Sequence, residues 1–387
     1  MRSSPLVGYL SAIGLGSTLA LAGLVNGCVG DEPAGNTPPA DPGDASSPCN
    51  GADCVDGGGG NGGADSGPDG AVDAGVDAKP PACTRIQVTT LAGSVEGDMN
   101  GAGNVATFKS PQGIAVDPAT GTLFVADTGN RLVRRVLSDG TTSTYSSTTS
   151  AGAWIAPRHA SFAAGFNSLF VSDHSHDQVF SVAANGTATT DFALGSLQAF
   201  AVQPTTFQKF VVGSTRVAKW ISGGGFEATV FSGTFESGFV DGAASGARYG
   251  HLLDLAFDGE TNLYVADQGN HRIRKVNVTA GANYGDVTTV AGSAAAGHVD
   301  GVGAAARFEG PHAFAVDPTT HLIYVADGAT IRVVTPAGVV STLVGSTSAY
   351  VDGDGCTAKF INVKGITKFA NELYVLDVNR IRKIVMD

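Results

Sequence analysis

Polar and charged side chains occupy two adjacent positions of a pattern that this chain repeats six times. Aligning the repeats places at the first position Gln112, Arg158, Gln198, Leu253, His312 and Lys364. At the second position stand Gly113, His159, Ala199, Asp254, Ala313 and Gly365. Amide, guanidinium, ammonium, imidazole and carboxylate groups around one entrance would form a small polar binding site. The alternative is a hydrated entrance that holds no ligand.

The predicted ligand-binding set consists of the members of these two positions that carry such groups. They are Gln112, Arg158, His159, Gln198, Asp254, His312 and Lys364.

A divalent metal ion would need three His or carboxylate ligands at about 2.0–2.2 Å. His251, Asp254 and His312 come from neighbouring repeats and are the best trio that the sequence offers. His159 belongs to a repeat on the opposite side, so we expect it to lie too far from His312 to share an ion. No P-loop, G-x-S-x-G, H-E-x-x-H or dinucleotide motif is present in the sequence. No catalytic residue is therefore assigned.

The elements that must position these residues are short strands in a repeating order. Each complete repeat has an apolar strand, a strand ending in Asp, a tight turn, a basic strand and an outer strand, here called a to d. The fullest copies span Gly113 to Val136 and Leu255 to Val276, and they contain V-A-D-T-G-N-R-L-V-R-R-V and V-A-D-Q-G-N-H-R-I-R-K-V. A period of about 40–60 residues built from strands alone indicates a β-propeller.

Counting the repeats predicts six blades. The first five run over residues 114–146, 160–192, 200–231, 255–291 and 314–344, and the sixth over residues 366–385 without an outer strand. The segment Ile86–Ala92 resembles the outer strands Val287–Ser293 and Val340–Ser346, so we expect it to complete the sixth blade. The predicted fold is therefore an all-β, six-bladed propeller closed by its N-terminal strand, which leaves no free sheet edge.

A second phrase precedes four of the blades, with Asn-Gly or Asp-Gly at its start and an aromatic residue eight positions later. Its copies are Asn100–Phe108, Asp241–Tyr249, Asp300–Phe308 and Asp352–Phe360. The Gly supplies a turn with positive φ, and the aromatic ring can fill the space between blades.

Together with P-Q-G-I-A-V-D and the V-A-D-T-G-N phrase, this pattern resembles the NHL-repeat β-propeller family. The resemblance covers Arg85 to Asp387 and is weakest in blades two and three, which contain V-S-D-H-S-H-D and V-V-G-S-T-R-V. It implies that the d–a and b–c loops share one face and that a ligand binds there. Relatives bind proteins, RNA or glycans, and one branch is a metal-dependent lyase, so fold alone does not choose a function.

Residues that recur in nearly every blade are expected to serve structure. The Asp of strand b would cap turn amides, as would the Asn of the following turn, and the Arg and Lys of strand c would form ion pairs. The Asp and Asn residues are Asp127, Asp267, Asp327, Asp377, Asn130 and Asn270. The basic residues are Arg134, Arg135, Arg274, Lys275, Arg382 and Lys383. His174 and His176 lie on a loop of blade two, where we expect solvent to surround them.

The N-terminal region is typical of export. Residues 1–27 form an apolar signal peptide that ends in L-V-N-G-C, which places Cys28 as the lipidated cysteine of a bacterial lipoprotein. A transmembrane anchor and an ordinarily cleaved signal peptide are the alternatives. Val29 and Gly30 follow without an Asp, which favours the outer membrane of a Gram-negative host. The expected location is the cell envelope, with the lipid as the membrane anchor.

Residues 28–82 are predicted to be a disordered tether. Gly, Ala, Asp and Pro dominate them, with ten acidic residues against Lys79, and they cannot bury enough apolar surface to fold. The propeller domain then spans residues 83–387. The formal net charge of −12 and the absence of a basic stripe argue against a nucleic-acid partner.

The chain has five cysteines. With Cys28 lipidated, Cys49 and Cys54 can close a small disulfide in an oxidising compartment. Strand direction predicts that Cys83 and Cys356 lie at opposite ends of the closing strand, too far apart for a bridge, which needs Cα atoms within about 7 Å.

Taken together, the sequence favours an exported, lipid-anchored and monomeric binding module for a protein, peptide or glycan ligand, with no resident cofactor. The alternative is a metal-dependent lyase or hydrolase at the channel mouth.

Overall fold

The computed structural model describes residues 85–193, 197–220, 228–259 and 261–386. The predicted signal peptide, the tether and the residues Cys28, Cys49, Cys54 and Cys83 lie outside these ranges. No helix within them is long and apolar enough to cross a membrane.

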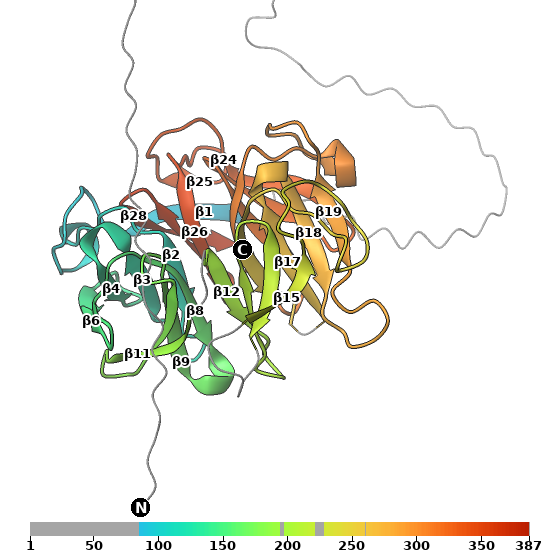
Figure 1. Cartoon of the computed structure of the whole chain (residues 1–387). Helices are drawn as coiled ribbons and strands as arrows, with labels where there is room; N and C mark the ends of the chain where they lie inside the picture. Colours follow the sequence, from blue (N-terminus) through green and yellow to red (C-terminus); the bar gives the residue numbers. More distant parts are fainter. Residues whose placement is uncertain (1–84, 194–196, 221–227, 260, 387) are drawn as a thin grey trace, which may run out of the picture. The chain divides into compact units, whose positions relative to one another are not determined.

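Six sheets, each built on four antiparallel strands, form the six blades of a propeller, as the sequence predicts (Figure 1). From the channel outwards the strands are β2 (Gly113–Val116), β3 (Leu123–Asp127), β4 (Leu132–Val136) and β5 (Thr142–Ser146) in blade one; β8 (Pro157–Ala163), β9 (Ser168–Asp173), β10 (Gln178–Val182) and β11 (Ala188–Ala193) in blade two; β12 (Ala199–Val202), β13 (Lys209–Val212), β14 (Arg216–Trp220) and β15 (Ala228–Gly233) in blade three; β16 (Leu252–Phe257), β17 (Asn262–Asp267), β18 (Arg272–Asn277) and β19 (Val287–Gly292) in blade four; β21 (Pro311–Val316), β22 (Ile323–Asp327), β23 (Thr330–Val334) and β24 (Val339–Gly345) in blade five; and β26 (Val363–Phe369), β27 (Glu372–Asp377), β28 (Arg380–Met386) and β1 (Ile86–Ala92) in blade six.

Short strands and 3₁₀ turns lie in the loops of the propeller. The two-residue strands are β6 (Thr148–Thr149), β7 (Gly152–Ala153), β20 (Gly301–Val302) and β25 (Gly353–Asp354), and they extend the outer edges of blades two, five and six. Single 3₁₀ turns are η2 (Gly103–Val105), η3 (Thr128–Asn130), η4 (Ala164–Phe166), η5 (Gln268–Asn270) and η6 (Gly303–Ala305).

The N-terminal strand closes the ring. β1 pairs antiparallel with the C-terminal strand β28, and the register joins Ile86 to Met386 and Val88 to Ile384. In Figure 1 the blue β1 lies among the red strands of the last blade. The inner strand of each blade contacts those of the two neighbouring blades, including β2 with β26, so the ring is continuous.

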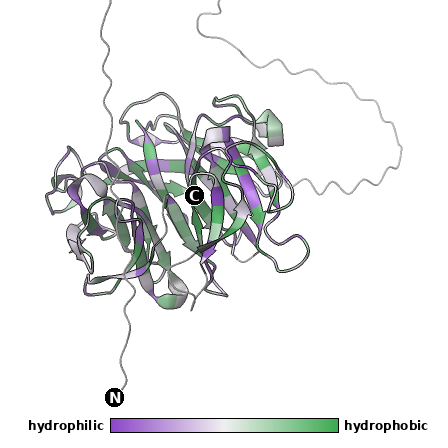
Figure 2. Ribbon diagram, in the orientation of Figure 1, coloured by the Kyte–Doolittle hydropathy of each residue, from purple (hydrophilic) through white to green (hydrophobic). Residues whose placement is uncertain are grey.

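Apolar residues fill the spaces between blades because both faces of each sheet are covered. Every residue of β3 and of β22 is buried, and Figure 2 shows hydrophobic residues along most strands. The predicted aromatic plugs Phe108, Tyr249, Phe308 and Phe360 are fully buried. The turn before Tyr249 also has the predicted conformation, since Gly242 adopts a φ of 114°.

The recurring Asp residues cap turn amides, as predicted, and they also form buried ion pairs. In blade four, Asp267 Oδ1 accepts from the backbone N–H of Gly250 at 2.8 Å, and Oδ2 accepts from Asn270 at 2.8 Å and from Arg274 at 2.9 Å. Both side chains of the Asp267–Arg274 pair are fully buried. The equivalent pairs are Asp127–Arg134, Asp327–Arg332 and Asp377–Arg382.

Blade two departs from this scheme where its sequence departs. Phe180 occupies the position of the buried Arg, and the buried Trp154 packs edge-on against it at 5.1 Å between ring centroids. Asp173 still caps the amides of Ile155 and Ala156.

The expected separation of Cys356 from the start of the closing strand is wrong. The loop before blade six folds back as β25, which pairs with β1 through Gln87 and Asp354. Gly355 then donates its N–H to the carbonyl oxygen of Ile86 at 2.9 Å. Cys356 is disulfide-bonded, and its partner lies outside the described ranges.

Candidate functional site

Irregular pairing positions the residues at the channel mouth. In four blades the register between the inner strand and its neighbour shifts at the mouth, between Pro157 and Ala160, Leu252 and Leu255, Pro311 and Ala313, and Val363 and Gly365. The residues inside these irregularities are Arg158, His159, Leu253, Asp254, His312 and Lys364. A bulge frees a residue from the ladder and redirects its side chain, which explains why these residues can turn toward the channel.

Blades one and three contribute glutamines in a different way. Gln112 and Gln198 stand immediately before the inner strands β2 and β12. Their backbone N–H groups donate to Ala126 and Val212 at 3.1 and 2.9 Å, which holds each residue at the edge of its sheet.

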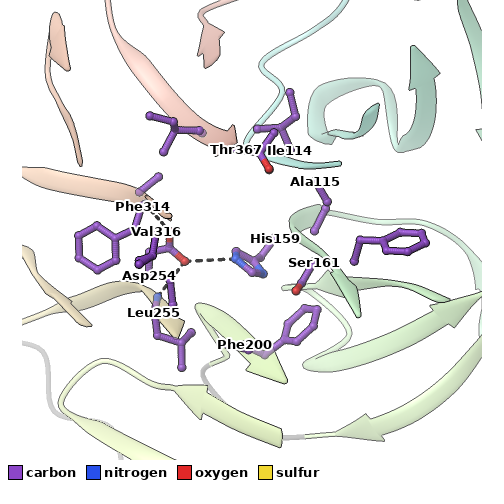
Figure 3. A pocket seen from close by; sticks show the side chains of 18 of the residues that line it. Ile114, Ala115, His159, Ser161, Phe200, Asp254, Leu255, Phe314, Val316 and Thr367 are labelled. Atoms are coloured by element: carbon purple, nitrogen blue, oxygen red, sulfur yellow. Dashed lines mark hydrogen bonds and ion pairs between the residues drawn. The ribbon is translucent and has the colours of Figure 1, made fainter. Parts of the chain in front are cut away.

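All seven residues of the predicted ligand-binding set line one cavity, whose volume is about 360 Å³. Figure 3 shows side chains from several blades pointing into this common space. The start of each inner strand follows a d–a loop, and the pairing of Gly113 with Ala126 places it beside the end of strand b. The polar mouth therefore opens on the face that carries the d–a and b–c loops.

The channel below the mouth is lined mainly by apolar side chains, with the hydroxyl groups of Ser161 and Thr367 among them. Its lining includes Ile114, Phe162, Phe200, Phe257 and Phe314. Polar and charged groups are thus concentrated at one end of the cavity.

His159 contacts Asp254 across the channel, with His159 Nε2 3.2 Å from Asp254 Oδ1 (Figure 3). The same carboxylate accepts from the N–H of Leu255 at Oδ1 and from the N–H of Phe314 at Oδ2, both at 2.8 Å. The His159 ring lies edge-on against Phe200, 5.0 Å away. Asp254 thereby links blades two, four and five and has both oxygens engaged within the protein.

Two cationic side chains of the mouth, Arg158 and Lys364, act electrostatically on His312. Burial and the nearby charges of Lys364 and Arg158 lower the pKa of His312 to about 4, so His312 is neutral at physiological pH. Burial and then the charge of Arg158 lower the pKa of Lys364, and burial lowers the pKa of Arg158. The charge of Arg158 thus acts on Lys364 and on His312, and the charge of Lys364 acts on His312.

The metal trio does not form a preorganised site here. Across the residues that the structure describes, no group of three or more His, Cys, Asp or Glu side chains could hold a metal ion. Asp254 faces His159 instead, and His251 does not line the cavity.

The two loop histidines of blade two make contacts within the protein, contrary to the expectation that solvent surrounds them. His174 Nδ1 lies 2.9 Å from the carbonyl oxygen of Leu197, and His176 Nδ1 lies 3.0 Å from Asp173. Both side chains are partly buried.

No protein-family model matches the chain, and no curated protein matches it either. Solved structures of similar fold include a Bacteroides thetaiotaomicron protein of unknown function, with 20% identity, a TM-score of 0.64, and coverage of 78% of this chain and 76% of that one. An auxiliary nutrient binding protein from the same species has 19% identity, a TM-score of 0.63 and coverage of 77% and 76%. An auxiliary nutrient binding protein from Bacteroides ovatus has 19% identity, a TM-score of 0.60 and coverage of 78% and 76%. At these identities the likeness concerns the fold.

Proposed function

We propose that this chain is an exported, lipid-anchored binding protein whose propeller holds a small polar ligand at the channel mouth. The observation that carries the proposal is the convergence of seven polar side chains from all six blades on one cavity. The cavity volume of about 360 Å³ falls within the range of small-molecule sites, roughly 300–1,000 Å³. The names of two similar structures, auxiliary nutrient binding proteins, agree with such a role.

Binding is favoured over catalysis by the arrangement of the His159–Asp254 pair. A general base must reach the proton that it removes, but His159 Nε2 faces Asp254 and its Nδ1 is buried without a partner. A metal-dependent lyase or hydrolase would need a donor cluster, and the described residues form none.

Thermal unfolding of the purified protein with a panel of neutral sugars, sugar acids and amino acids tests the proposal. A ligand that binds the folded state raises the melting temperature. We expect at least one compound to do so, and the shift to vanish in Gln198→Ala but not in Arg135→Gln, since Arg135 is exposed on β4. A panel without effect, or a shift that survives Gln198→Ala, would contradict the proposal.

The anchor is tested separately. Replacing Cys28 by Ala should abolish lipid labelling and move the protein from the detergent phase to the aqueous phase, because one acylated cysteine supplies the membrane affinity. Unchanged partitioning would show that another segment holds the protein at the membrane.

A further inference from the structure

The channel mouth holds two cations that have no counter-ion among the residues that the structure describes. Arg158 and Lys364 line the cavity, and neither forms an ion pair with another residue in the described ranges. By contrast, each buried arginine of strand c has a buried aspartate as its ion-pair partner. The mouth therefore differs from the repeating structural scheme of the blades.

The one carboxylate in the lining, Asp254, forms no ion pair with either cation. Asp254 already accepts hydrogen bonds from two backbone amides and contacts His159. Arg158 and Lys364 instead act on each other and on His312, since their charges lower the pKa values of Lys364 and His312. Like charges held in a concave, partly buried site create a local positive potential that attracts an anion.

A second observation points to a ligand with hydroxyl or amide groups. Gln198 lines the cavity with an exposed fraction of only 8%, and its Oε1 atom is buried without a hydrogen-bond partner. An unpaired buried amide oxygen is costly. The amide can rotate about its last torsion and present either oxygen or nitrogen to a neighbour, so Gln198, like Gln112, suits a partner that both donates and accepts.

The charge balance distinguishes classes of anion. Two cations face one carboxylate in the lining, and His312 is neutral at pH 7, so a single negative charge restores balance whereas a phosphate monoester overcompensates. The planar guanidinium of Arg158 also matches a carboxylate through two parallel hydrogen bonds. The apolar channel wall of Ile114, Phe200 and Phe314 restricts the charged end of a ligand to the mouth.

Resting on the function proposed above, we infer that the ligand is a small hydroxylated monocarboxylate of the sugar-acid class. Its carboxylate contacts Arg158 and Lys364, and its hydroxyl groups contact Gln112 and Gln198.

Calorimetric titration of the purified full-length protein tests this inference with matched probes. D-glucuronate and D-galacturonate supply the carboxylate, D-glucuronamide and D-galactose are uncharged counterparts, and D-glucose 6-phosphate carries a dianion. We expect at least one acid to bind at least about tenfold more tightly than its uncharged counterpart and than the phosphate, the effect of one or two charge-assisted hydrogen bonds.

Variants link that preference to the site. Arg158→Gln and Lys364→Gln should each weaken binding of the acid by about tenfold or more and leave weak binding of the uncharged sugar unchanged. Arg158→Lys keeps the charge and should retain part of the affinity, while Arg135→Gln should bind as the wild type does. Unchanged melting temperatures of the ligand-free variants exclude misfolding as the cause.

Two results would overturn the inference, and they differ in what they say of the proposed function. If an uncharged sugar binds as tightly as its acid and Gln198→Ala, but not Arg158→Gln, abolishes binding, the mouth is a binding site but not for anions. If none of the probes binds and the wider panel of neutral sugars and amino acids also fails, both the inference and the proposed function are wrong.

Discussion

Replacing Val88 by alanine should lower the free energy of unfolding by about 2–3 kcal/mol, although the residue lies in the first strand of the propeller. Val88 is fully buried and packs in a cluster with Val363, Leu373 and Ile384. Removing its two methyl groups costs about 1.6 kcal/mol in transfer free energy at about 0.8 kcal/mol each, and the cavity adds roughly a further 1 kcal/mol.

The assay is urea denaturation followed by the fluorescence of Trp154 and Trp220. Thr89→Ala is the matched control, because Thr89 is the exposed neighbour on the same strand and should change stability by less than about 0.5 kcal/mol. If both variants unfold at the wild-type midpoint, β1 does not close the ring. Beginning the chain at Glu96 is the stronger perturbation, since it leaves β28 with a free edge and should cause aggregation, whereas deleting residues 29–81 should be almost silent.

Three further predictions address the blades, the mouth and the disulfide. Asp267→Asn should destabilise the protein by about 3–5 kcal/mol, because it leaves the fully buried guanidinium of Arg274 without its buried counter-charge. The control Asp98→Asn changes an exposed residue and should not destabilise the protein. Equal urea midpoints for the two variants would refute the reasoning. The unfolded chain protonates His312 near pH 6.5, but the folded protein protonates it only near its pKa of about 4, so the stability of the protein falls as pH drops through this window. His312→Gln should remove up to about 3 kcal/mol of that loss and should leave stability at pH 7.5 unchanged. Acid titration of the melting temperature of both proteins would show this. Cys356→Ser should lower the free energy of unfolding by about 2–4 kcal/mol, and a reductant should lower that of the wild type by the same amount. A variant as stable as the oxidised wild type would mean that the disulfide adds nothing to the stability of the protein.

The six-bladed ring and its closure could be predicted because each blade repeats the same strand sequences. The outer-strand phrase V-T-T-L-A-G-S at the N-terminus matches those of later blades, and β1 forms with the predicted bounds Ile86–Ala92. Each recurring Asp could be assigned a structural role for the same reason, since a residue needed in every blade cannot be the single catalytic group.

Contacts across the channel could not be predicted from the repeats. The approach of His159 to Asp254 depends on the width of the channel and on register shifts at both residues, and neither has a signal in the sequence. The error at Cys356 has a similar origin, because β25 turns the preceding loop back along β1, and two paired residues are too few to give a strand pattern.

The roles of Arg158 and Lys364 could be predicted only in part from the sequence. Alignment of the repeats placed both at the mouth, and the structure places both in the lining of one cavity. Their lack of acidic partners among the described residues became visible only when the surrounding strands were in place, because Asp254 is engaged by His159 and two backbone amides.

The most direct test of the account is a crystal structure of the protein with the sugar acid that binds most tightly. We predict that the ligand lies at the channel mouth, with carboxylate oxygens about 2.7–2.9 Å from nitrogens of Arg158 or Lys364 and a hydroxyl group against Gln198. A ligand found on the outer loops, or one whose carboxylate points away from both cations, would contradict the account.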